Sequence, residues 1–371
     1  MVSPSRLLHS SVAYVSRREF SNTMCSAVPI FPIAPKNPGL QPRGFSYHFK
    51  LKESKHQSKT KVPKKEMEIP VIDFSQLDGE NRSKTMALLH NACEKWGFFK
   101  IENHGVNKDL MEKVKNLVNS HYENNLKASF YESEVVKSLG NGRTSNMDWE
   151  SSFFISHRPK SNMDEFQNLS EDLRKAMDEY IAQLIELAEK LSELMCENLS
   201  LEKHHIKKAF SGKTGPSVGT KVAKYPKCPQ PENVRGLREH TDAGGIILLL
   251  QDDQVPGLEF LKDGEWVQIP PSKNNAIFVN TGDQIEVLSN GRYKSALHRV
   301  MTIKDGSRLS IATFYNPAGD AIISPAQKLL YPNQFSFADY LKLYATTKFL
   351  DKEPRFESLK KMTSACNGVI V

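Results

Sequence analysis

Two histidines and one aspartate have the side-chain types and the spacing of a metal site. His240 and Asp242 are separated by one residue, which places both side chains on the same face if the segment is a β-strand. His298 follows after 55 intervening residues, in a run of sequence that also predicts a strand. Two imidazoles and one carboxylate fill one face of an octahedron and leave three positions open, as in non-haem iron(II) oxygenases. Zinc binds the same ligand types and is the alternative metal.

Arg308 and Ser310 repeat the one-residue spacing, starting ten residues after His298. On a strand, the guanidinium can bind a carboxylate through two charge-assisted hydrogen bonds, and the hydroxyl can add a third. Taken singly, a histidine or an arginine is more often an ordinary hydrogen-bonded or solvated residue. The three elements in sequence therefore indicate a metal site with an anion-binding site beside it.

The segments around these residues are short, rich in β-forming residues and separated by turn signals such as Asp263-Gly264 and Asn290-Gly291. Many short strands with regular turns predict a sandwich or jelly roll, with its core at about residues 215–325. The expected strands are Gly219–Tyr225, Gly245–Gln251, Leu258–Leu261, Trp266–Ile269, Ala276–Asn280, Ala296–Thr302 and Leu309–Tyr315.

Helical periodicity lies on both sides of this β-rich region, and one short strand is expected at Ile69–Phe74. The fold is therefore expected to be mainly β, with a jelly-roll core braced by N-terminal helices and a C-terminal helix. The expected helices are Ser83–Phe99, a second from the capping residue Asn107 to about His121, a third at about Ser170–Asn198, and Phe337–Phe349.

The overall composition is that of an ordinary globular protein. Of the 371 residues, 39% are hydrophobic and 25% are charged, enough to form a substantial core. No apolar run approaches the roughly 20 residues that cross a bilayer, so we expect no stable membrane insertion. The five cysteines are scattered without a CxxC pair, which argues against a disulfide framework and a cysteine zinc site and favours a reducing, intracellular setting.

The formal net charge of +7 is concentrated near the N-terminus. Residues 1–66 contain 12 Lys and Arg residues and three acidic residues, together with many Ser and Pro residues, whereas residues 67–371 are close to neutral. This distribution does not favour nucleic-acid binding, and it predicts a disordered basic extension before one catalytic domain. The extension is either an organelle transit peptide or the product of a start codon upstream of Met67. We expect a cytoplasmic protein, or an organellar one if residues 1–66 act as a transit peptide.

Together, the H-x-D motif, the later histidine and the R-x-S motif resemble the signature of the plant iron(II) and 2-oxoglutarate dioxygenase superfamily. The resemblance runs from Met67 to about Met362 and includes Ile69-Pro-Val-Ile-Asp-Phe, Trp96-Gly-Phe-Phe and Asn103-His-Gly. The fold that it implies is a double-stranded β-helix, another name for the jelly roll.

Within that superfamily the chain resembles the family of 1-aminocyclopropane-1-carboxylate (ACC) oxidases. Two positions discriminate best: Ala223-Lys-Tyr stands where users of 2-oxoglutarate typically read Asn-Tyr-Tyr, and Arg238 precedes the first metal histidine by two residues. Lys221 also matches this family. Longer matching segments are Asp148-Trp-Glu-Ser-Ser-Phe-Phe, Gly219-Thr-Lys-Val, Leu237-Arg-Glu-His-Thr-Asp-Ala-Gly-Gly, Phe314-Tyr-Asn-Pro and Glu353-Pro-Arg-Phe-Glu.

The resemblance implies the iron(II)-dependent oxidation of ACC by dioxygen and ascorbate to ethylene, carbon dioxide and cyanide. Bicarbonate or carbon dioxide would be the activator, and 2-oxoglutarate would not be needed. By the same resemblance, the anion-binding wall would consist of Lys221, Arg238, Arg308 and Ser310. Residues that match positions near the family's pocket or its C-terminal motif are Tyr225, Gln251, Lys294, Phe314, Arg355 and Glu357.

The chain departs from the family at Glu239, where alanine is common. We expect this side chain to face away from His240, because adjacent strand residues alternate, although a carboxylate beside Arg238 would weaken its hold on an anion. One alternative function is a 2-oxoglutarate-dependent hydroxylase or desaturase of a plant small molecule. A second is a ligand-binding protein on the same barrel without catalysis. These motifs indicate no particular oligomeric state.

Overall fold

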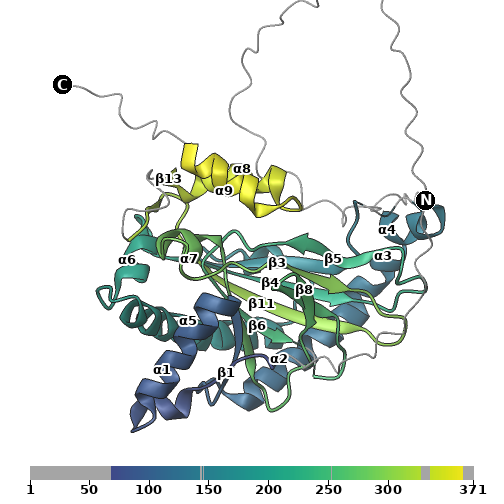
Figure 1. The fold of residues 1–371 in the computed structure, drawn as a ribbon. Helices are drawn as coiled ribbons and strands as arrows, with labels where there is room; N and C mark the ends of the chain where they lie inside the picture. Colours follow the sequence, from purple (N-terminus) through teal and green to yellow (C-terminus); the bar gives the residue numbers. More distant parts are fainter. Residues whose placement is uncertain (1–67, 143, 145, 252, 327–334, 362–371) are drawn as a thin grey trace, which may run out of the picture. The chain divides into compact units, whose positions relative to one another are not determined.

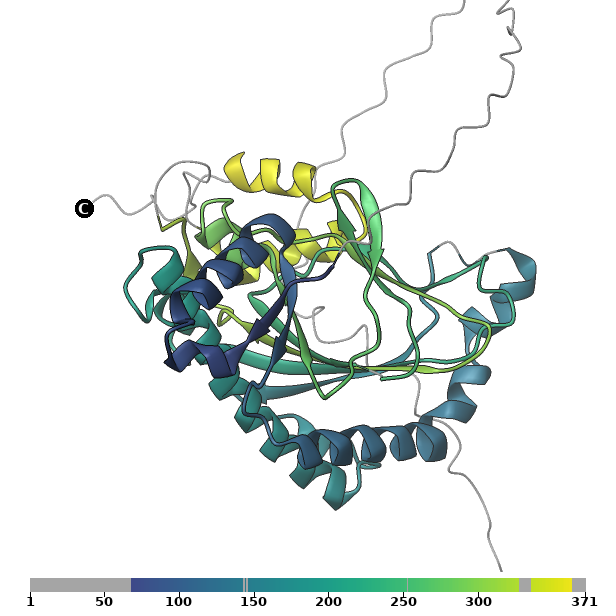
Figure 2. The ribbon, with the colours of Figure 1, turned by 60° about the horizontal axis from the view of Figure 1, so that its bottom comes forward.

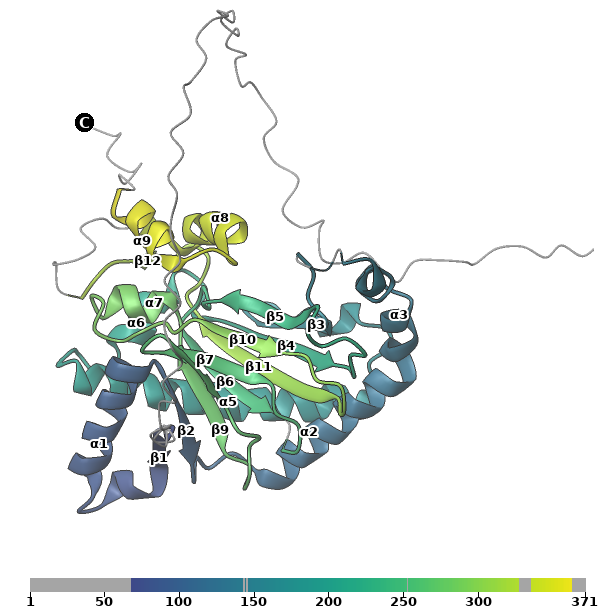
Figure 3. The same ribbon diagram turned by 45° about the vertical axis from the view of Figure 1, so that its right-hand side comes forward.

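Two β-sheets pack against each other at the centre of the fold (Figures 1 and 3). The computed structural model of the chain describes residues 68–361, apart from 143, 145, 252 and 327–334. Side chains from both sheets form one apolar cluster, which includes Tyr225, Leu249, Phe260 and Val300. This arrangement confirms the predicted jelly roll.

The larger sheet contains seven strands in the order β1-β2-β9-β6-β11-β4-β3. All neighbouring pairs are antiparallel except β1 and β2, which are parallel. Three of its strands come from the chain before residue 215, so the N-terminal region extends the sheet as well as covering it. The strands are β1 (Val71–Asp73), β2 (Phe98–Glu102), β3 (Ser151–Arg158), β4 (Ser217–Tyr225), β6 (Ile246–Gln251), β9 (Ile277–Thr281) and β11 (Arg308–Asn316).

The smaller sheet has the order β5-β10-β7-β8 and carries both histidines of the predicted metal site. A separate two-stranded sheet joins β12 and β13. The strands of these two sheets are β5 (Arg235–His240), β7 (Leu258–Lys262), β8 (Glu265–Gln268), β10 (His298–Met301), β12 (Ile322–Ile323) and β13 (Phe335–Ser336).

Helices cover the outer face of the larger sheet and one end of the barrel. The long helices α2 and α5 pack side by side below that sheet (Figure 2), and they bury an apolar stripe against β6 and β11. Helices α8 and α9 lie together at one end of the barrel, above α7 and β5 (Figures 1 and 3). The helices are α1 (Arg82–Asn91), α2 (Lys108–His121), α3 (Lys127–Tyr131), α4 (Glu134–Ser138), α5 (Glu171–Asn198), α6 (His205–Ser211), α7 (Asp283–Leu288), α8 (Phe337–Thr347) and α9 (Lys352–Lys361).

Two predicted helices begin with a side-chain cap, at the expected capping residue Asn107 and at Ser170, which was predicted as a helix start. The Asn107 side chain accepts a hydrogen bond from the Leu110 backbone N–H at the start of α2. The Ser170 hydroxyl does the same for the Leu173 N–H at the start of α5. Each cap satisfies an N–H that has no partner within the helix.

The predicted helix Ser83–Phe99 was wrong at its C-terminal end. Helix α1 ends at Asn91, a π-helical turn continues from Ala92 to Trp96, and Phe98 begins strand β2. Gly97 ends the helix in the left-handed region at φ +78°, and a Cβ there would lie 2.3 Å from the Lys294 carbonyl oxygen. Only glycine combines this backbone conformation with so close an approach.

Three cysteines lie within the described residues, Cys93, Cys196 and Cys228, and all three are buried free thiols. Among the described helices, none has the length and apolar content of a transmembrane span. The predictions for residues 1–66 lie outside the described residues, and so does Cys366.

Candidate metal centre

His240, Asp242 and His298 come together in the fold with their ligand atoms within 4.8 Å of one another. The two histidines lie directly opposite each other in the antiparallel pair of strands β5 and β10. Their Nε2 atoms lie 3.9 Å and 3.6 Å from the two carboxylate oxygens of Asp242. All three residues are buried. Two imidazole nitrogens and one carboxylate at this separation fit a single metal ion bound on one face.

Backbone carbonyls fix the orientation of both imidazoles. Nδ1 of His240 lies 2.7 Å from the carbonyl oxygen of Arg238, and Nδ1 of His298 lies 3.2 Å from that of Ala296. If each Nδ1–H donates to its carbonyl, each Nε2 keeps its lone pair for a metal. Burial lowers the pKa of His240 well below its ordinary value, and His298 and Lys348 add to this effect, which favours the uncharged imidazole.

Asp242 occupies a different position from the one predicted. Strand β5 ends at His240, so Asp242 lies in the loop that follows and not in the strand. Asn280 on β9 donates a hydrogen bond of 2.8 Å to one Asp242 oxygen, which leaves the other turned toward His240. The sequence analysis missed Asn280, because only the pairing of distant strands brings it to the site.

Six of the predicted pocket residues lie on one face of the larger sheet. Directly paired residues of antiparallel strands share a face, and the register pairs Arg308 with Tyr225 and Ser310 with Gln251. This face is turned toward Phe260, whose ring stacks on His298 with 4.6 Å between centroids. The six residues are Lys221, Tyr225, Gln251, Arg308, Ser310 and Phe314.

Arg308 is buried in this face with only 2% of its surface exposed. Its Nη2 donates a hydrogen bond of 2.9 Å to Gln251 Oε1, and its guanidinium carbon lies 5.6 Å from the centre of the Tyr225 ring. A buried guanidinium held in this way is oriented in advance for a planar anion. Gln251 therefore acts on the pocket by holding Arg308.

Lys221 and Arg238 are each paired with a carboxylate that the sequence analysis did not single out. Lys221 Nζ lies 2.7 Å and 2.9 Å from the two oxygens of Glu150. Arg238 donates from Nε and Nη2 to Asp148, at 2.9 Å and 3.1 Å. Both carboxylates belong to the segment Asp148-Trp-Glu, which the sequence analysis quoted for its resemblance to the family without assigning a role to either acid. These pairs offset much of the positive charge that the two cations bring to the site.

Lys348 and Phe349 are further residues of the site that the sequence analysis missed. The Phe349 ring covers the Arg238 guanidinium at 3.8 Å and meets the His240 ring edge-on, with 6.0 Å between centroids. Burial lowers the pKa of Lys348, and the charge of Lys221 lowers it further, whereas Asp242 opposes the shift. Both residues follow α8, so the C-terminal part of the chain contributes directly to the wall of the site.

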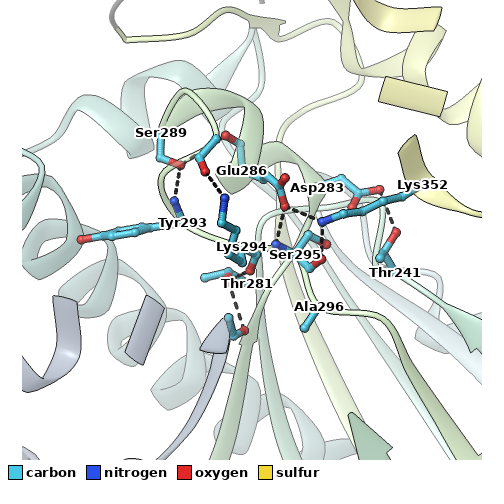
Figure 4. A network of polar contacts seen from close by, with 12 residues as sticks. Thr241, Thr281, Asp283, Glu286, Ser289, Tyr293, Lys294, Ser295, Ala296 and Lys352 are labelled. Atoms are coloured by element: carbon cyan, nitrogen blue, oxygen red, sulfur yellow. Dashed lines mark hydrogen bonds and ion pairs between the residues drawn. The ribbon is translucent and has the colours of Figure 1, made fainter. Parts of the chain in front are cut away.

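Lys294 is not brought to the pocket face. It is exposed in the loop before β10, and its ammonium donates a hydrogen bond of 2.6 Å to the Gly291 carbonyl (Figure 4). Glu239 faces away from the site, as expected for a residue that alternates with His240, and pairs with Arg299 at 3.0 Å. Arg355 is buried and contacts Asp283, whereas Glu357 is exposed.

Comparison with known proteins identifies the family of this chain. The model of the 2OG-Fe(II) oxygenase superfamily matches residues 217–317, and that of the "non-haem dioxygenase in morphine synthesis N-terminal" region matches residues 69–179. The chain is 71% identical to 1-aminocyclopropane-1-carboxylate oxidase 1 of Arabidopsis thaliana, over 82% of this chain and 98% of that protein. The chain belongs to the ACC oxidase family. It is also 50% identical to ACC oxidase 3 of Cucumis melo, over 81% of this chain and 96% of the relative.

Solved structures place the same family within the wider superfamily. The structure described as "JOX2 in complex with 2OG, Fe, and JA" is 32% identical and covers 78% of this chain and 88% of its own, with a TM-score of 0.67. A rice dioxygenase for auxin oxidation shares the fold with a TM-score of 0.62, at 22% identity, over 80% of this chain and 99% of its own. Family membership and the donor set together identify iron(II) as the metal of the His240, Asp242 and His298 site.

Proposed function

We propose that this ACC oxidase converts ACC to ethylene, carbon dioxide and cyanide, with ascorbate as the electron donor and bicarbonate or carbon dioxide as the activator. The observation that carries the proposal is the buried His240, Asp242 and His298 triad in a chain that is 71% identical to an ACC oxidase. Dioxygen would accept two electrons from ACC and two from ascorbate, giving two water molecules, so the reaction balances.

Bound iron(II) would supply the redox chemistry and three positions for substrate and dioxygen. The protein's part is to hold the reactants in place. His240 and His298 would present the lone pairs of their Nε2 atoms, since their Nδ1 atoms face carbonyl groups, and Asp242 would present the oxygen that Asn280 does not occupy. A ligand set fixed in this way lowers the entropic cost of assembling the reactants.

Arg308 and Ser310 would hold the carboxylate of ACC or of another small anion. Their side chains share a face of β11, and Arg308 is already oriented by Gln251. The guanidinium can give two parallel hydrogen bonds to such a carboxylate, and the serine hydroxyl can add a third.

Lys221 and Arg238 would bind the activator or ascorbate. Because Asp148 engages Nε and Nη2 of Arg238, an anion would meet this residue at Nη1. The carboxylate partners would limit the affinity for monovalent anions and keep both cations in one orientation between turnovers.

One solved relative gives a reason to weigh a second function. The structure of JOX2, at 32% identity, contains 2OG and iron, and a 2-oxoglutarate-dependent hydroxylase or desaturase would share the fold and the Arg308 position. Full-length protein with iron(II), ascorbate, bicarbonate and ACC in air separates the two functions. We expect ethylene in the headspace without added 2-oxoglutarate. A requirement for 2-oxoglutarate, with succinate as product, would instead establish the second function.

We further propose a cytoplasmic location and no nucleic-acid partner, with an organellar location if residues 1–66 act as a transit peptide. A fluorescent fusion of the full chain, compared with a fusion that begins at Met67, tests the location. Organelle import that depends on residues 1–66 would replace the cytoplasmic proposal. The same truncated chain is expected to keep its ethylene-forming activity, since every proposed site residue follows Met67.

A further inference from the structure

The residue between two of the metal ligands, Thr241, is held by the C-terminal helices. Its side chain is 1% exposed and points away from the ligands into a buried polar cluster. The Thr241 hydroxyl accepts a hydrogen bond from Arg355 Nη2 of α9 and donates one of 3.2 Å to Asp283 Oδ2. The hydroxyl of Tyr344, on α8, donates to the Thr241 backbone carbonyl. Both groups that Thr241 offers on this side are therefore engaged by distant elements.

Asp283 is the centre of this cluster. It is fully buried, and its Oδ2 atom receives hydrogen bonds from Thr241, from the Tyr340 hydroxyl of α8 and from Arg355 at 3.2 Å (Figure 4 shows the contact with Thr241). One oxygen thus joins the segment after β5, helix α8 and helix α9. Arg355 and Asp283 form an ion pair with both side chains at 0% exposure, and the loss of one partner would leave an uncompensated buried charge.

The start of α7 holds the rest of the loop that carries Asp242. The Asp283 N–H donates a hydrogen bond of 2.8 Å to the Asp242 carbonyl, and Gln284 Nε2 donates one of 2.9 Å to the Ala243 carbonyl. Three successive carbonyls, those of Thr241, Asp242 and Ala243, are therefore fixed from outside the loop. These hydrogen bonds restrain the backbone that carries the Asp242 carboxylate and thereby favour one direction of that side chain.

Helix α9 also reaches the segment that carries the third ligand. Lys352 Nζ donates a hydrogen bond of 2.6 Å to the carbonyl of Ser295, three residues before His298, and pairs with Glu286 at 2.7 Å (Figure 4). The Ser295 N–H donates to the same Glu286 oxygen at 2.6 Å. Through Arg355 and Lys352, helix α9 therefore contacts both chain segments that carry the three ligands.

We propose that α8 and α9 are a positioning element of the iron site, and that Thr241, Asp283, Tyr340 and Tyr344 are positioning residues that act through the ligand loop. None of these four touches the metal position, so their effect would be on the geometry and affinity of the site. The inference rests on iron ligation by the triad, and it does not depend on the substrate or the electron donor. Partners that orient metal ligands typically contribute about 10–100-fold to metal affinity.

The sharpest test replaces Thr241 in the full-length protein and measures cobalt(II) binding, since cobalt(II) resists oxidation in air and reports ligand geometry in its visible spectrum. Thr241→Val keeps the volume but loses the hydroxyl, and it should weaken cobalt(II) binding about tenfold or more and shift the visible bands. Thr241→Ser keeps the hydroxyl and should restore both. Tyr344→Phe and Asp283→Asn should weaken binding in the same direction.

Tyr293→Phe is the matched control, because it also removes a buried hydroxyl, one that lies 2.9 Å from His90 Nδ1 on α1. Its cobalt(II) affinity and spectrum should equal those of the wild type. Wild-type binding and spectra in Thr241→Val and Tyr344→Phe would overturn the proposal and reduce the C-terminal helices to a structural cover. An equal loss of affinity in Tyr293→Phe would also overturn it, because the effect would then follow general stability. If Asp283→Asn fails to fold, the comparison of Thr241→Val with Thr241→Ser and the result for Tyr344→Phe still test the proposal.

Discussion

Arg238 donates two side-chain hydrogen bonds to Asp148, a residue 90 positions earlier in the chain, while the Phe349 ring covers its guanidinium. The arginine is thus fixed on two sides before any anion arrives. A flexible side chain loses conformational entropy when it is held in one geometry. Because Arg238 is already held before binding, it resembles a prepared binding site more than a solvated surface residue.

Removal of the charge at Arg238 or Lys221 should raise the bicarbonate or ascorbate concentration needed for half-maximal ethylene formation. We expect an increase of about tenfold or more for Arg238→Gln and Lys221→Gln, since hydrogen bonds to charged groups contribute about 1.5–3 kcal/mol. Arg238→Lys should recover only part of the function, because an ammonium cannot hold Asp148 through two parallel hydrogen bonds and still present a fixed N–H to an anion, as the planar guanidinium does. Iron affinity should stay close to that of the wild type.

Titration of bicarbonate and of ascorbate against ethylene output measures this effect. Arg292→Gln is the control, because Arg292 is an exposed arginine whose ion pair with Glu94, at 3.3 Å, lies apart from the pocket face. Curves for the Arg238 and Lys221 variants that superimpose on the wild type would return both residues to a purely structural role.

Each single alanine substitution at His240, Asp242 or His298 should abolish iron binding and turnover. Two remaining ligands cannot hold the metal, and no fourth His, Cys, Asp or Glu residue joins the triad in the part of the chain that the structure describes. The fold should persist, which circular dichroism can verify alongside metal analysis of the purified variants. Normal ethylene formation by any of the three would show that the site has been assigned to the wrong residues.

Glu239→Ala should leave the bicarbonate requirement unchanged and alter the free energy of unfolding by no more than about 1 kcal/mol. Glu239 contacts Arg299 and not Arg238, and Arg299 keeps a second partner in Glu259 at 2.7 Å and a stacking contact with Trp266 at 3.9 Å. Chemical denaturation and the bicarbonate titration check both parts. A lower bicarbonate requirement in the alanine variant would mean that Glu239 does weaken anion binding at Arg238.

His157 should make the fold sensitive to acid. Burial lowers its pKa to about 4, below the value of roughly 6.5 for an exposed histidine. A histidine with a lowered folded-state pKa contributes its full stability above the unfolded pKa and loses it as the pH falls from about 6.5 to 4, by up to ~3 kcal/mol. His157→Gln, which keeps a polar group near Thr220, should lose stability less steeply over this range. Parallel denaturation curves at each pH in the two proteins would contradict this assignment.

Local patterns were sufficient to predict the chemistry of the site and most of its supporting elements. His240, Asp242 and His298 were identified from residue type and spacing, and the strand alternation of Arg308 and Ser310 predicted their common face. The caps at Asn107 and Ser170 also follow from local hydrogen bonding. The Arg308–Ser310 pair and the helix caps depend on residues within a few positions of one another, and the short-range geometry of strands and helices encodes them. His298 was instead assigned to the site by its residue type and by the spaced signature, because 55 residues separate it from Asp242.

Only the tertiary structure decided what surrounds those residues. The pairs between Arg238 and Asp148, between Lys221 and Glu150, and between Arg355 and Asp283 join segments far apart in the chain. Periodicity within a segment carries no information on which distant carboxylate will neutralise a cation, since that depends on how the sheets pair and how the C-terminal helices pack. The sequence by itself therefore determined the ligands, whereas the packing of the whole chain determined their charge environment and the support behind Thr241.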